Sequence, residues 1–93
     1  MKPLKEMSIE ELKEYDERCT EHSENVKRIC AAMNNFLEVY RNRSKEENLN
    51  SILKIEETID LHEKQGRELG MVTTLPEACR ETLKVFKSLA KLD

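Results

Sequence analysis

Apolar side chains recur every three or four residues along the first half of the chain. From residue 12 to residue 40 the spacings alternate between three and four, which is the heptad pattern of a helix that packs against other helices. The pattern therefore predicts a long N-terminal helix with one apolar edge. The nine positions of this heptad seam are Leu12, Tyr15, Cys19, His22, Val26, Ile29, Met33, Phe36 and Tyr40.

Three helix starts are indicated by a serine or threonine followed three residues later by a glutamate. In such a capping box each side chain bonds the backbone amide of the other residue. Pro76 suits the first turn of the last helix, and Gly70 can close the middle helix in the left-handed conformation. We expect helices over about 9–43, 45–69 and 75–91. The three boxes are Ser8 with Glu11, Ser44 with Glu47 and Thr74 with Glu77.

The predicted second and third helices are also amphipathic, and the connections between helices are short. Short connections place consecutive helices antiparallel to each other. We therefore expect one all-α domain over residues 1–93, an antiparallel three-helix bundle or helical hairpin with a long, coiled-coil-like N-terminal helix. A charged fraction of 38% agrees with helices that expose much of their surface.

A break in the first helix is the alternative to this bundle. The segment from Cys19 to Asn25 contains several poor helix formers, and a kink there would give a self-contained four-helix bundle. We prefer a continuous helix because the heptad phase passes through this segment without slipping.

A turn centred near Ser44 sets the register of the first two helices, so that facing residues have numbers adding to about 88. In this register the second helix ends beside Cys19, and no helix reaches residues 8–18. Each apolar side chain of residues 8–18 that stays in water loses about 1.5–3 kcal/mol of burial free energy. This segment is therefore predicted to bind a partner. The candidate partner-binding residues are Ile9, Leu12, Tyr15 and Cys19.

Two segments of the chain itself could cover this stripe instead. One is the N-terminal tail, through Leu4 and Met7, and the other is the loop from Met71 to Leu75.

The charge pattern excludes several classes of partner. Nineteen acidic and sixteen basic side chains are mixed along the chain and give a net charge of −3, too weak a field to attract nucleic acid. Apolar runs are only a few residues long, so we expect no membrane insertion. Three cysteines without a closely spaced pair favour a reducing compartment, and we expect a cytoplasmic protein.

Catalytic and cofactor motifs are not found in the sequence, which predicts a protein that is not an enzyme and needs no cofactor. Glycine-rich phosphate loops and nucleophile motifs are missing, and a thin core leaves little room for a substrate cleft. One metal alternative remains open, because the register brings two thiols and two imidazoles to one level as in a tetrahedral zinc site. Its ligands would be Cys19, His22, His62 and Cys79. We expect instead that the histidines lie at the edge of the core and that no metal binds.

The sequence thus predicts a small adaptor or complex subunit that binds a helix of another protein, or a second copy of itself, through a coiled-coil face. Two alternatives stay open beside it. One is a chaperone or inhibitor that shields a client helix in the groove between the first and third helices, and the other is the metal-binding bundle.

Overall fold

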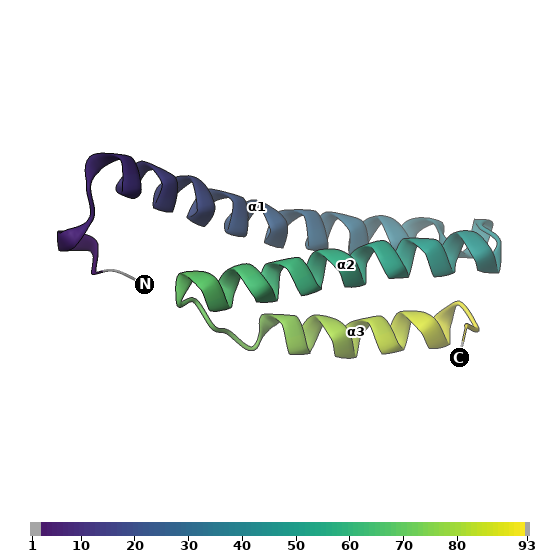
Figure 1. Ribbon diagram of the computed structural model, residues 1–93. Coiled ribbons are helices and arrows are strands. Elements are labelled where there is room, and N and C mark those ends of the chain that lie inside the picture. The colour runs from purple at the N-terminus through teal and green to yellow at the C-terminus, as the bar shows by residue number, and fades with distance from the viewer. Residues whose placement is uncertain (1–2, 93) are drawn as a thin grey trace.

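The computed structural model describes residues 3–92 and shows an all-α antiparallel bundle, which confirms the predicted fold class (Figure 1). The molecule is elongated, with extents of 52 × 18 × 16 Å. Two short 3-10 turns, η1 and η2, precede and follow the first helix. In chain order the elements are η1 (Leu4–Glu6), α1 (Ile9–Val39), η2 (Tyr40–Asn42), α2 (Lys45–Leu69) and α3 (Leu75–Leu89).

α1 is a single helix of 31 residues. It begins with the predicted capping box, in which the Ser8 hydroxyl accepts from the Glu11 amide at 3.2 Å. It continues without a break through the segment from Cys19 to Asn25, so the kinked four-helix alternative was wrong. It ends at Val39 rather than near residue 43, because the chain tightens into η2 before it turns toward α2.

The hairpin between α1 and α2 has the register that the sequence predicted. The Asn48 side-chain amide donates to the Tyr40 carbonyl oxygen at 2.9 Å, and His22 lies against Gly66, so both pairs of numbers add to 88. Ser44 caps α2 through the second capping box. This register places the end of α2 far short of the beginning of α1.

α2 ends in a Schellman motif that depends on Gly70. Gly70 has φ 73° in the left-handed region that favours glycine, its amide bonds the Arg67 carbonyl at 3.3 Å, and the Met71 amide bonds the Gly66 carbonyl at 2.7 Å. These bonds satisfy carbonyl groups that the helix end would otherwise leave without partners.

α3 begins differently from the prediction. Thr74 is the N-cap residue, but its side chain makes no capping hydrogen bond, and the box with Glu77 does not form. Thr74 has helical backbone angles (φ −87°, ψ −1°) instead of the extended geometry of the two serine caps, and the Thr73 hydroxyl accepts from the Leu75 amide at 3.3 Å. Pro76 lies in the first turn as expected. α3 ends at Leu89, two residues before the expected end.

All three helices contribute to one core. Ile52 and Ile59 of α2 lie at its centre and are fully buried. The Phe36 ring of α1 stacks on the Phe86 ring of α3 with centroids 4.9 Å apart. The buried core residues are Ile29, Phe36, Ile52, Ile55, Ile59, Cys79, Leu83 and Phe86.

Ion pairs add a polar seam between α2 and α3. The Arg80 guanidinium donates to both carboxylate oxygens of Glu63, at 2.9 and 3.0 Å, and to Asp60 at 2.8 Å. These hydrogen bonds from Arg80 lower the pKa of Glu63. The Lys87 ammonium also pairs with Glu56 at 3.0 Å. The cations of α3 therefore fix its register on the acidic edge of α2.

Candidate interaction surface

The N-terminal third of α1 projects beyond the end of α2, as Figure 1 shows. We call residues 9–18 the overhang. Two of its apolar side chains face solvent, since Ile9 is 69% exposed and Leu12 is 39% exposed. Tyr15 and Cys19 are half-buried. The structure thus divides the four candidate residues into two exposed ones and two that the chain partly covers.

The tail reaches only the base of the overhang. Met7 lines a recess together with Tyr15 and the last residue of α2, Leu69, which is 4% exposed. Leu4, by contrast, is 53% exposed. The tail therefore leaves the exposed apolar side chains of the overhang in solvent.

The loop after α2 packs away from the overhang. The carbonyl oxygen of Met71 lies beside Gly66, at the level of His22, and Val72 is 77% exposed. Neither of the two covering segments considered from the sequence therefore buries Ile9 or Leu12.

The overhang carries most of the excess negative charge of the chain. Residues 9–18 hold five acidic and two basic side chains, an excess of three that equals the net charge of the whole protein. Arg18 pairs with Glu14 at 2.7 Å, on the exposed surface. The neighbouring Cys19 thiol raises the pKa of Tyr15 above its ordinary value.

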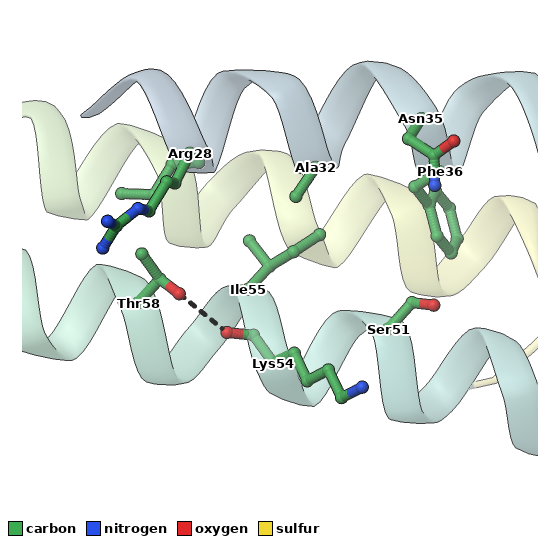
Figure 2. A pocket seen from close by; sticks show the side chains of 9 residues that line it. Arg28, Ala32, Asn35, Phe36, Ser51, Lys54, Ile55 and Thr58 are labelled. Atoms are coloured by element: carbon green, nitrogen blue, oxygen red, sulfur yellow. Dashed lines mark hydrogen bonds between the residues drawn. The ribbon is translucent and has the colours of Figure 1, made fainter. Parts of the chain in front are cut away.

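A second open surface lies between α1 and α2. We call it the α1–α2 groove; it is lined by α1 residues from Arg28 to Phe36 and by α2 residues from Ser51 to Thr58, and its volume is about 250 Å³. Figure 2 shows α3 behind this groove, so that the opening is on the side of the hairpin that α3 leaves free. Ile29, Phe36 and Ile55 form an apolar floor, and Arg28 and Lys54 are the charged residues of its lining.

The two histidines form a buried stacked pair. Their ring centroids are 4.0 Å apart with an interplanar angle of 10°, and His22 and His62 are 8% and 3% exposed. The Nδ1 atoms of both rings are buried and have no hydrogen-bond partner among the described residues. A recess of about 140 Å³, lined also by Gly66 and Pro76, adjoins the pair.

The four candidate metal ligands do not come together. The Cys19 thiol interacts with Tyr15, while burial raises the pKa of the Cys79 thiol with a further contribution from Cys30. Over residues 3–92 no group of three or more histidine, cysteine or acidic side chains is placed to hold a metal ion. The sequence register was accurate enough to align the histidines along the bundle, but it could not show that the two thiols face other neighbours.

Stability is expected to fall in mild acid because of His22. Burial, and next the neighbouring His62, lower the pKa of His22 below its usual value of about 6.5. The unfolded chain therefore binds a proton at a higher pH than the folded chain does, so stability is full above about pH 6.5 and declines as the pH falls below it.

Urea unfolding at about pH 7.5 and pH 5.5 measures this effect, with a lower midpoint expected at the acidic pH. The variant His22→Phe is the control and should show a smaller shift between the two. An equal shift in both proteins would assign the acid sensitivity to other groups.

Asn25 is the residue of this region that the sequence pattern missed. It is fully buried, and its side-chain amide donates to the Gln65 oxygen at 2.7 Å, while its own oxygen accepts from Arg28 at 3.1 Å. Val26, which the heptad pattern assigns to the seam, is only half-buried. Asn25 lies three residues after His22 and four before Ile29, which are helical spacings, although it breaks the strict alternation that Val26 keeps.

No family model, curated protein or solved structure matches this chain. Among the described residues no helix is both long and apolar enough to cross a membrane.

Proposed function

We propose that this chain is a non-enzymatic protein-protein interaction module that binds a helix through its overhang. The observation that carries the proposal is the exposure of Ile9 and Leu12 on a helical segment that no other helix within residues 3–92 covers. Complete burial of a fully exposed aliphatic side chain contributes about 1.5–3 kcal/mol, so a partner that covers Ile9 and the exposed part of Leu12 gains a share of this free energy from each.

A helix is the partner that fits this surface best. Leu12, Tyr15 and Cys19 keep the three-and-four spacing that matches the knobs and holes of a facing helix. The partner is a second copy of the chain or a helical subunit of a larger complex. All three cysteines are free thiols, which supports the cytoplasm as the proposed location.

The chaperone alternative places a client helix between the first and third helices. That side is occupied in the structure by the stack of Phe36 on Phe86, and the open groove lies between α1 and α2 instead.

Site-specific crosslinking tests the proposal without knowledge of the partner. A photoreactive amino acid placed at Leu12 is expected to give a covalent product heavier than one chain of 10.9 kDa in the cells that make the protein. The matched control position is Leu53 of α2, which is 45% exposed and lies outside the groove lining. Adding Ile9→Glu should remove the product at position 12, because a charge in the stripe opposes burial.

A further inference from the structure

The α1–α2 groove differs in charge from the rest of this acidic protein. The chain contains 19 acidic residues, yet within residues 3–92 none of them lines the groove. Among the described residues no carboxylate pairs with Arg28 or Lys54, and the Arg28 guanidinium donates only to the neutral side chain of Asn25. The groove therefore combines an apolar floor with cations that lack a counter-charge.

The occupied side of the hairpin shows which kind of helix such a groove accepts. There α3 covers the apolar floor while its cations, Arg80 and Lys87, pair with carboxylates on the edge of α2. On the open side the charges are reversed, because the cations Arg28 and Lys54 belong to the edges of the hairpin itself. A helix that docks there by the same principle needs an apolar stripe and flanking carboxylates.

The overhang has these two properties. It presents Ile9 and Leu12 to solvent, and residues 9–18 carry a charge excess of three carboxylates. At about 1.5 Å per residue the ten residues of the overhang extend about 15 Å, and the nine α1 residues from Arg28 to Phe36 extend about 13.5 Å. The two surfaces are therefore opposite in charge, both partly apolar, and similar in length.

We propose that the overhang of one copy docks in the α1–α2 groove of a second copy, so that the helix supplied by the neighbour covers the side of the hairpin that α3 leaves open. This inference rests on the proposed function and names the partner as a second copy of the chain. Each copy has one overhang and one groove, so every copy can insert its overhang into one neighbour and accept the overhang of another copy.

A charge exchange between two variants tests the inference. The groove variant carries Asn35→Glu and Lys54→Glu, and the overhang variant carries Asp16→Lys and Glu17→Lys; none of these four side chains makes a hydrogen bond or ion pair within residues 3–92, so the fold should persist. We expect light scattering to give a mass of two chains or more for the wild type and one chain for each variant alone.

Mixing the two variants should restore the wild-type association, because each overhang then meets a groove of opposite charge. Circular dichroism verifies that both variants are folded, and a salt titration of the wild type gives a second measurement that needs no substitution. Association is expected to weaken at about 1 M salt, where charges are screened beyond about 3 Å.

Three results would overturn the inference: a wild type with the mass of one chain, a groove variant that associates like the wild type, or an association that salt does not weaken. A heavier crosslinked product at position 12 in any of these cases would keep the proposed function and assign the overhang to a different partner. Loss of both the self-association and the crosslink would reject the proposed function as well.

Discussion

Replacement of Phe36 by alanine is expected to lower the free energy of unfolding by about 3–5 kcal/mol. Phe36 is 2% exposed, and its ring stacks on Phe86 and on Tyr40, with centroids 4.9 and 5.6 Å apart. The substitution removes the contact that joins α1 to α3 and leaves a cavity that the surrounding helices fill only in part. A domain of this size typically has a stability of roughly 0.05–0.15 kcal/mol per residue, so the loss is a large fraction of the total.

Urea unfolding followed by circular dichroism measures this loss. The matched control is Leu37→Ala at the adjacent position, where the side chain is 47% exposed and a change within about 0.5 kcal/mol is expected. Similar losses at positions 36 and 37 would contradict the orientation of α1 in the bundle.

Substitution of Gly66 by alanine is expected to destabilise the protein although alanine is the better helix former. A Cβ atom at this position would lie 2.8 Å from the Met71 carbonyl oxygen and 3.3 Å from the His22 ring. The carbonyl belongs to the backbone of the Schellman turn and cannot move without breaking it. Overpacking costs about 1–3 kcal/mol, which exceeds the gain of about 1 kcal/mol in helix propensity.

The same unfolding measurement applies to Gly66→Ala, with Lys64→Ala as the control on the exposed face of α2. The control is expected to change the stability by no more than about 0.5 kcal/mol. If Gly66→Ala were more stable than the wild type, the close approach of the loop to α2 would be wrong.

Much of the fold follows from local signals in the sequence. The serine capping boxes and Gly70 mark helix ends because their chemistry acts within a few residues. The third box failed because Thr74 adopts a helical conformation at the end of a tight loop, where its side chain cannot accept from the Glu77 amide. A spacing of residues indicates a cap only when the backbone before the helix is extended.

The buried residues of α1 are harder to predict from the sequence than the helix ends, because α1 packs against two helices rather than one. Asn25 and Val26 each lie three or four residues from His22 and from Ile29, but the strict alternation and the hydrophobicity both favour Val26. The structure buries Asn25 because Gln65 of α2 satisfies its amide, a partner forty positions away that no local pattern identifies.

The two open surfaces were predictable to different degrees. The overhang follows from helix lengths and the position of one turn, and the observed register reproduces it. The α1–α2 groove depends on which side of the hairpin α3 occupies, and short connections do not determine that side. Its lack of carboxylates becomes visible only after residues of two helices are brought together.

Crosslinking from position 12, compared with position 53, tests most directly the claim that the overhang is an interaction surface. We predict a product heavier than one chain from Leu12 and none from Leu53, with twice the chain mass if the partner is a second copy. No heavier product from position 12, or equal yields from both positions, would contradict the claim.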